Sequence, residues 1–330
     1  MKIAFFSTQP YDKEFFEREN KDGRFIYQFF TSQLESHIVN AVDPVDAVCV
    51  FVNDKVNREV IKVLASKGVK IIALRCAGFN NVDLEAAKEF GLTVCRVPAY
   101  SPEAVAEHAT AMLLTLNRKI HKAYNRVREQ NFVLQGLLGF NLFGRTVGVI
   151  GTGKIGKAFT RIMLGFGCHV LAYDLYENKD LIELGVRYVT LDELYSQSNI
   201  ISLHCPLTPE NRHMIDKVSL DNMKEGVMLI NTSRGALIDT VAAIEGLKSK
   251  RIGGLAIDVY EQEEKIFFQD LSDTIIEDDT LQRLMSFPNV LITAHQAFFT
   301  DEALTQIARV TLDNIESLLL NKPTNKAVLL

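Results

Sequence analysis

Arg234 stands where an arginine could do chemistry, in a short polar turn directly after an apolar run. The stretch "VMLINTSRG" covers residues 227–235 and passes from a predicted buried strand into Asn-Thr-Ser-Arg-Gly. A charge in such a turn is either solvated at the surface or placed to bind an anionic group through charge-assisted hydrogen bonds. The polar residues elsewhere in the chain must decide between these two interpretations.

Two histidines also end apolar runs, His204 in "ISLHCPLTPE" and His295 in "VLITAHQAFF". Histidine titrates near neutrality with little adjustment, so it can act as a general acid or base. His204 either lines a ligand site through a rigid proline-containing loop or is held by local hydrogen bonds. A carboxylate partner would orient a catalytic ring and favour its charged form. The stretch "DVYEQEE" offers three such carboxylates, and spacing alone does not choose among Glu261, Glu263 and Glu264.

A glycine-rich turn is the most specific pattern in the sequence. "TVGVIGTGKIGKAF" places Gly151, Gly153 and Gly156 between an apolar strand and a predicted helix, as dinucleotide binding requires. Glycines there let the backbone approach a pyrophosphate at the helix N-terminus. The next strand, "HVLAYD", ends in Asp174, whose carboxylate would accept hydrogen bonds from ribose hydroxyls and repel a 2′-phosphate. The pattern therefore predicts NAD rather than NADP as the cofactor.

The elements that must position these residues are apolar strands that alternate with helical segments, which indicates parallel sheets covered by helices. One predicted helix of about 25 residues or more begins at Ser101 and carries a continuous apolar stripe, which could form core or contact a partner subunit. The helix 83–90 ends at Gly91. Because ligands bind at the carboxyl ends of such strands, Arg234 is expected to point into the cofactor cleft. The predicted strands are 3–6, 47–52 and 70–74 in a first unit, and 146–150, 169–173, 199–204, 227–230, 254–257 and 289–293 in a second.

Length and composition exclude several classes of protein. A chain of 330 residues predicts two domains. The net charge of −5, with scattered lysines and arginines, gives no sign of binding to nucleic acid or an anionic membrane. The five cysteines are widely spaced, so we expect neither a metal site nor a disulfide framework. "MKIAFF" is too short for a signal peptide, and no apolar run is long enough to span a membrane. A cytoplasmic protein is the resulting expectation.

The sequence resembles the D-isomer-specific 2-hydroxyacid dehydrogenases over essentially its whole length. "GVIGTGKIG", "HCPLTPEN", "MLINTSRGALID", "AIDVYEQE" and "TAHQAFFT" occur in the order and spacing of that family. The resemblance implies two Rossmann-like or flavodoxin-like doubly wound parallel-sheet domains separated by a cleft. Residues 1–99 with 300–330 would form the substrate-binding domain, completed by a C-terminal helix, and residues 100–299 the NAD-binding domain.

Matching motif positions also implies roles for individual residues. Arg234 would bind the substrate, His295 would be the general acid/base, and Glu263 would be its partner. The substrate-binding set would be Arg75, Cys76, Ala77 and Gly78, through their backbone amides, with Tyr100, Phe298 and Phe299 around a small pocket. The cofactor-binding set would be Gly151, Gly153, Lys154, Ile155, Gly156, Asp174, His204, Cys205, Pro206, Thr232, Ser233 and Asp258, the last of these near the nicotinamide amide.

"RCAGFNNVDL", "VPAYSPEAVAEH" and "AHQAFFTDEAL" are most similar to the branch that reduces pyruvate to D-lactate with NADH. Some relatives carry a tyrosine where Phe299 stands, which leaves the choice among small 2-oxoacids open. The alternatives are a dehydrogenase for hydroxyisocaproate, glycerate or phosphoglycerate, and an NAD-sensing corepressor that binds partner peptides. A formate dehydrogenase is disfavoured, because the histidine's partner position holds a carboxylate. The apolar stripe predicts a homodimer or a homotetramer.

Overall fold

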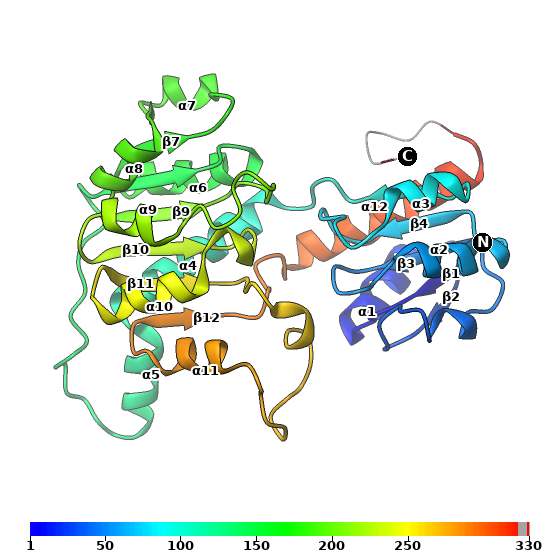
Figure 1. Cartoon of the computed structure of the whole chain (residues 1–330), viewed down its shortest axis with the longest axis horizontal. Coiled ribbons are helices and arrows are strands. Elements are labelled where there is room, and N and C mark those ends of the chain that lie inside the picture. The colour runs from blue at the N-terminus through cyan, green and yellow to red at the C-terminus, as the bar shows by residue number, and fades with distance from the viewer. Residues whose placement is uncertain (323–328, 330) are drawn as a thin grey trace. The chain divides into compact units, whose positions relative to one another are not determined.

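The chain forms two compact α/β units in this computed structural model, which describes residues 1–322 and residue 329 (Figure 1). Unit 1 consists of Met1–Ser101 and Phe299–Leu330, and unit 2 of Pro102–Phe298. The boundaries predicted from the sequence, at 99/100 and 299/300, lie within two residues of these. Residues 323–328 and 330 of the predicted first domain lie outside the described part of the chain.

Unit 1 is built on a parallel sheet with the strand order β2-β1-β3-β4-β5, which is the flavodoxin-like order. Every residue of β3 and β4 is buried, so both faces of the sheet are covered. The sequence prediction missed β2 and β5. The strands are β1 (Lys2–Phe5), β2 (Ile26–Phe29), β3 (Ala47–Val50), β4 (Ile71–Leu74) and β5 (Thr93–Arg96).

The helices of unit 1 come from both ends of the chain. The C-terminal helix α12 packs against α1 and β4, and the Thr300 side chain caps it by accepting from the amide of Ala303. An ion pair between Arg18 and Asp301 joins α1 to α12, with 2.9 Å between Nη1 and Oδ1. The helices are α1 (Pro10–Glu19), α2 (Arg58–Ser66), α3 (Leu84–Glu89) and α12 (Asp301–Leu319), with the 3-10 turn η1 (Val39–Ala41).

Unit 2 carries a seven-stranded parallel sheet in the order β12-β11-β10-β9-β6-β7-β8. From β6 the chain adds β7 and β8 on one side, and then β9 to β12 on the other side. The boundary between β6 and β9 is the switch point at which doubly wound folds bind ligands. Six of these strands were predicted, and the two-residue edge strand β8 was missed. The strands are β6 (Thr146–Ile150), β7 (His169–Tyr173), β8 (Arg187–Tyr188), β9 (Ile200–Leu203), β10 (Val227–Asn231), β11 (Ile252–Ile257) and β12 (Val290–Ile292).

Two helical layers cover this sheet because alternate residues of each strand point to opposite faces. In β10, Met228 and Ile230 join the core cluster that contains α4 and α6, whereas Leu229 joins the cluster that contains α8, α9, α10 and α11. Both layers are visible in Figure 1. The helices are α4 (Pro102–Arg118), α5 (Ile120–Arg128), α6 (Lys154–Gly165), α7 (Lys179–Glu183), α8 (Leu191–Gln197), α9 (Lys217–Asn222), α10 (Thr240–Lys248) and α11 (Asp279–Ser286), with the 3-10 turns η2 (Gly235–Leu237) and η3 (Glu263–Lys265).

The prediction of one long helix after Ser101 was wrong, because the chain turns between α4 and α5 at Lys119. This residue takes a left-handed conformation, with φ +51° and ψ 38°. Its ammonium donates to the carbonyls of Gly136 and Leu138, and Asn117 exchanges two hydrogen bonds with the backbone of Phe140. These contacts attach residues 136–140 to the turn between α4 and α5. No residue of α5 is buried, so its apolar stripe is not core.

Candidate active site

The carboxyl ends of the unit 2 strands gather the polar residues that the sequence singled out. Gly151 follows β6, Asp174 follows β7, His204 follows β9, Arg234 follows β10, and His295 lies shortly after β12. Parallel strands end at the same edge of a sheet, so the topology brings these residues to one edge.

The glycine turn between β6 and α6 leaves room for a phosphate group. Gly151 has φ +91°, and a Cβ atom on it would lie 2.6 Å from the backbone nitrogen of Cys205. A Cβ on Gly156 would lie 1.9 Å from the carbonyl oxygen of Gly151, so the turn and the helix touch. A Cβ on Gly153 would meet nothing within 4 Å, and no side chain of the described residues caps α6 there. The amides of the first helical turn, which contains Lys154 and Ile155, therefore face open space and can bind an anion.

Asp174 is held at the edge of this turn by three protein donors. The amide and the hydroxyl of Thr152 donate to its Oδ2, at 2.5 and 3.1 Å, and the amide of Tyr176 donates to Oδ1 at 3.1 Å. A carboxylate offers about four lone-pair sites, so acceptor capacity remains for a ligand hydroxyl.

Two other predicted cofactor residues carry buried polar atoms without a partner among the described residues, namely Nδ1 of His204 and the hydroxyl of Thr232. Such atoms cost free energy unless a ligand or water satisfies them. The remaining ring nitrogen of His204 bonds to Ser202 at 2.8 Å. Burial lowers the pKa of His204 to about 3, so its ring is neutral near pH 7. This histidine therefore suits a lining role rather than proton transfer.

Arg234 is presented by a tightly constrained turn. Its carbonyl accepts from the side chain of Asn231 at 2.8 Å, and its Nη1 donates to the carbonyl of Ser233 at 2.7 Å. The hydroxyl of Ser233 in turn donates to the carbonyl of Cys205, beside the exposed Pro206, at 2.5 Å. No carboxylate of the described residues lies within ion-pair distance of the Arg234 guanidinium. Its charge is thus available to an external anion.

Of the three carboxylates that the sequence offered, Glu263 is the one that pairs with His295. Its Oε1 lies 2.8 Å from Nδ1 of His295, and its Oε2 accepts from the amide of Tyr260 at 2.9 Å. Glu261 bonds instead to Arg212 and His213. The Glu263 contact leaves Nε2 of the His295 ring as the nitrogen that can exchange a proton with a bound ligand.

The backbone of His295 is held in the left-handed region, with φ +52°. Its amide donates to the carbonyl of Asp258 at 2.7 Å, and the ring of Phe268 lies 5.9 Å away, centroid to centroid. Left-handed backbone is uncommon for a residue other than glycine and persists only where the surroundings impose it. Asp258 supplies most of that constraint.

The side chain of Asp258 is fully buried, with 0% exposure, and its predicted place near the nicotinamide amide stays a prediction. Its carboxylate accepts from the hydroxyl of Thr293 at 2.5 Å and from the amides of Gln296 and Ala297 at 2.9 Å, and it lies 3.4 Å from Nε2 of His108. Burial alone would raise the pKa of Asp258, but these hydrogen bonds outweigh it and lower the pKa. The side chain therefore fixes the segment that carries His295.

Sequence reasoning missed His108 and Thr293. His108 lies in the middle of α4 without any local signal, and its Nε2 is 3.1 Å from the Thr293 hydroxyl. In the sequence, Thr293 is only the last residue of a predicted apolar strand. Only the fold shows that both side chains meet the same buried carboxylate.

In unit 1, the prediction for Arg75 needs correction. Its amide donates to the carbonyl of Val50 at 3.1 Å and so is already used. Its guanidinium is fully buried and bonds to Asp12, at 3.1 and 3.2 Å, and to the carbonyl of Ser7. Arg75 thus joins β4 to α1 inside the unit. The rest of the predicted loop, Cys76, Ala77 and Gly78, follows Arg75 after the end of β4.

The aromatic residues of the predicted pocket lie where the chain passes between the units. Tyr100, near the end of the first segment of unit 1, is partly buried. Phe298 ends unit 2 and is buried, whereas Phe299 belongs to unit 1 and is 51% exposed. The ring of Phe299 lies edge-on to Tyr11, with centroids 4.9 Å apart.

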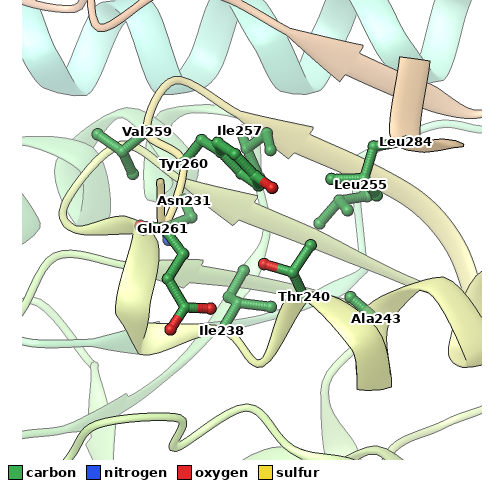
Figure 2. A pocket seen from close by; sticks show the side chains of 11 residues that line it. Asn231, Ile238, Thr240, Ala243, Leu255, Ile257, Val259, Tyr260, Glu261 and Leu284 are labelled. Atoms are coloured by element: carbon green, nitrogen blue, oxygen red, sulfur yellow. The ribbon is translucent and has the colours of Figure 1, made fainter. Parts of the chain in front are cut away.

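Figure 2 shows a small pocket in unit 2 that is distinct from these residues. It lies between the turn after β10, β11 and α10, and most of its lining side chains are apolar. None of the predicted catalytic or cofactor residues lines it. The described residues also hold no group of His, Cys, Asp and Glu side chains suited to a metal ion, and none of their helices has the length and apolar character to cross a membrane.

Comparison with known proteins identifies the class to which this fold and site belong. The model of the D-isomer specific 2-hydroxyacid dehydrogenase, NAD binding domain, matches residues 110–297. The chain therefore belongs to the D-isomer-specific 2-hydroxyacid dehydrogenase family. It is an NAD-dependent enzyme that acts on D-2-hydroxyacids, and the predicted family, fold class and cofactor are confirmed.

Particular relatives are similar over nearly the whole chain. The D-lactate dehydrogenase of Escherichia coli strain K12 is 55% identical over 318 residues, which cover 96% of this chain and 97% of that protein. The structure of apo D-lactate dehydrogenase from Escherichia coli matches 100% of both chains, with a TM-score of 0.92 and 52% identity. The D-lactate dehydrogenase of Aquifex aeolicus, complexed with NAD and lactic acid, has a TM-score of 0.85 and 35% identity, covering 97% of this chain and 96% of that one.

Proposed function

We propose that this protein is an NAD-dependent D-lactate dehydrogenase that reduces pyruvate to D-lactate. The observation that carries the proposal is the paired Glu263 and His295 at the sheet edge where Arg234 has no ion-pair partner among the described residues. The 55% identity to a D-lactate dehydrogenase supports pyruvate as the substrate.

Each side chain then has a distinct task. Arg234 binds the carboxylate of the 2-oxoacid and polarises its ketone, through charge-assisted hydrogen bonds that contribute about 1.5–3 kcal/mol each. Nε2 of His295, in the protonated ring, gives its proton to the alkoxide oxygen as that oxygen forms. Glu263 holds Nδ1, so the ring keeps its orientation and its charge has a counter-ion.

The cofactor supplies the hydride when it is bound. The residues suited to hold it are the glycine turn for the pyrophosphate, Asp174 for the adenosine ribose, and His204 and Thr232, whose buried polar atoms need a partner. The rest of the cofactor set stays a prediction: Lys154 and Ile155 begin α6, Cys205 and Pro206 follow β9, Ser233 follows β10 and Asp258 follows β11. Of the substrate-binding set, Cys76, Ala77, Gly78, Tyr100, Phe298 and Phe299 stay predictions.

The test is the loss of NADH absorbance with pyruvate, 2-oxobutyrate, 2-oxoisocaproate, hydroxypyruvate and glyoxylate, with NADPH as the cofactor control and chiral analysis of the product. Fastest turnover with pyruvate, giving D-lactate, would support the proposal. Preference for 2-oxoisocaproate or hydroxypyruvate would assign a different D-2-hydroxyacid. Tight NADH binding without turnover on any of these acids would point to a cofactor-sensing binding protein.

We also propose that a second copy of the chain covers α5 and residues 129–143, which we call the apolar arm. The arm's carbonyls are bonded internally to Lys119 and Arg126, so its surface is shaped before any partner binds. Large exposed apolar groups are uncommon on a monomer surface. The exposed apolar side chains here are Ile120, Tyr124, Val127, Phe132, Val133, Leu134, Leu138 and Phe143.

A cytoplasmic location and the absence of nucleic-acid partners stay predictions.

A further inference from the structure

Asn178 and Tyr188, both outside the glycine pattern, and Thr152, which lies between Gly151 and Gly153, form a chain of hydrogen bonds that ends on Asp174. The amide of Asn178 donates to the hydroxyl of Tyr188 at 2.9 Å, and that hydroxyl lies 2.8 Å from Oγ1 of Thr152. The hydroxyl of Thr152 lies 3.1 Å from Oδ2 of Asp174. Tyr188 stands on the edge strand β8, two strands from the glycine turn, so the chain links three separate segments of unit 2.

The direction of every bond in this chain is determined by its two ends. A backbone amide can only donate, and an ionised carboxylate can only accept. The hydroxyl proton of Tyr188 must therefore point to Thr152, and that of Thr152 to Asp174. Hydrogen bonds aligned in this way polarise and strengthen one another. Thr152 is buried, so its hydroxyl has little access to water as an alternative partner.

We propose that Tyr188 is a positioning residue for the choice of cofactor. Acting through Thr152, it holds the carboxylate of Asp174 in one orientation, with lone pairs left to accept the adenosine ribose hydroxyls. The same fixed carboxylate repels a 2′-phosphate, because it cannot rotate away from it. Tyr188 thus increases the preference for NADH over NADPH, and this holds whichever 2-oxoacid the enzyme reduces.

The proposal is tested by binding rather than by turnover. Tyr188→Phe removes one hydroxyl, and Thr152→Val removes the next while keeping the side-chain shape and the backbone amide. Fluorescence titrations of the full-length protein would give Kd for NADH and NADPH. We expect Tyr188→Phe to raise Kd for NADH about 3- to 10-fold, the range for one lost hydrogen bond, and to leave Kd for NADPH unchanged or lower. Thr152→Val should have an effect at least as large.

The double variant separates a connected chain from two unrelated contacts. Because Tyr188 acts only through Thr152, the double variant should bind NADH no more weakly than Thr152→Val alone. Tyr195→Phe is the matched control. Its hydroxyl donates to the carbonyl of Met214 at 3.2 Å in the same unit, and its loss should leave both Kd values unchanged.

Three results would overturn the proposal: an unchanged Kd for NADH in Tyr188→Phe, an equal loss of affinity for both cofactors, or losses that multiply in the double variant. Thermal unfolding of each variant checks that the fold is intact. If Tyr188→Phe does not fold, Thr152→Val alone carries the same comparison between NADH and NADPH.

Discussion

The carboxylate of Glu263 lies 2.8 Å from Nδ1 of His295, while its second oxygen is held by the amide of Tyr260. The carboxylate is thereby fixed at both oxygens and cannot follow a ring that rotates. The other ring nitrogen, Nε2, therefore has a fixed direction, as the proposed proton transfer to a substrate requires.

Replacing His295 with glutamine should reduce turnover with pyruvate about 10²- to 10⁴-fold, because glutamine cannot transfer a proton. The affinity for NADH should stay within about twofold, since His295 takes no part in the predicted cofactor site. Steady-state kinetics and NADH titration measure the two effects. A large loss of NADH binding with little change in turnover would contradict the assignment.

The pH dependence should have opposite signs in the two directions. Reduction needs the protonated His295 ring and should fall as the pH rises, whereas lactate oxidation needs the neutral ring and should fall as the pH drops. Rates measured from pH 5 to pH 9 in both directions test this, and identical profiles would exclude His295 as the acid/base.

Asp258→Asn should affect catalysis through position rather than through cofactor binding. An amide cannot accept from all the donors that meet Asp258, so the segment 293–297 loses part of its support. We expect a loss of about 1–3 kcal/mol in the free energy of unfolding and a lower kcat. Chemical unfolding and steady-state kinetics measure these. An unchanged kcat with weaker NADH binding would contradict this expectation and would support the predicted place of Asp258 beside the nicotinamide.

Leu138→Asp should shift the protein from a larger to a smaller assembly, because it places a charge within the apolar arm, where Leu138 is 87% exposed. Sedimentation velocity across a range of concentrations measures the change. Val241→Asp on α10 is the control, since Val241 is also exposed but lies on the helical layer opposite α4. A wild-type protein that sediments as a monomer would refute the proposed association.

His204 should make the free protein less stable in mild acid. Burial lowers its pKa to about 3, whereas an unfolded histidine titrates near 6.5. Between these values the unfolded chain binds a proton that the folded chain does not, so the free energy of unfolding falls as the pH falls, by at most about 1.4 kcal/mol per pH unit. Unfolding of His204→Gln without cofactor should show a shallower loss between pH 7 and pH 5. Equal slopes would argue against a buried neutral ring.

The sequence predicted the central strands well because they are buried on both faces and therefore uniformly apolar. β6 and β7 have the predicted bounds. Two of the missed strands, both at sheet edges, carry less of this signal: β2 is only partly buried, and β8 has two residues. Periodicity also could not detect the break at Lys119, because an apolar stripe continues across it, and the stripe does not tell core from exposed surface.

The candidate site was predicted where local pattern and chemistry coincide, as at the glycine turn and Arg234. The residue pattern alone left three carboxylates within "DVYEQEE" as possible partners of the histidine. Only the resemblance to the family selected Glu263 among them. The burial of Asp258 and its contact with His108 depend on the packing of α4 against the sheet, which no local pattern contains. Arg75 was misjudged for the same reason, since its partner Asp12 lies 63 positions away.

Gly156 lies so close to the carbonyl of Gly151 that no other residue fits there. The turn therefore takes its shape together with α6, before any nucleotide arrives. The conformational entropy of this loop is lost during folding and not again on binding. More of the contact energy with a nucleotide then appears as affinity, and nucleotide association can proceed without a slow step in which the loop becomes ordered.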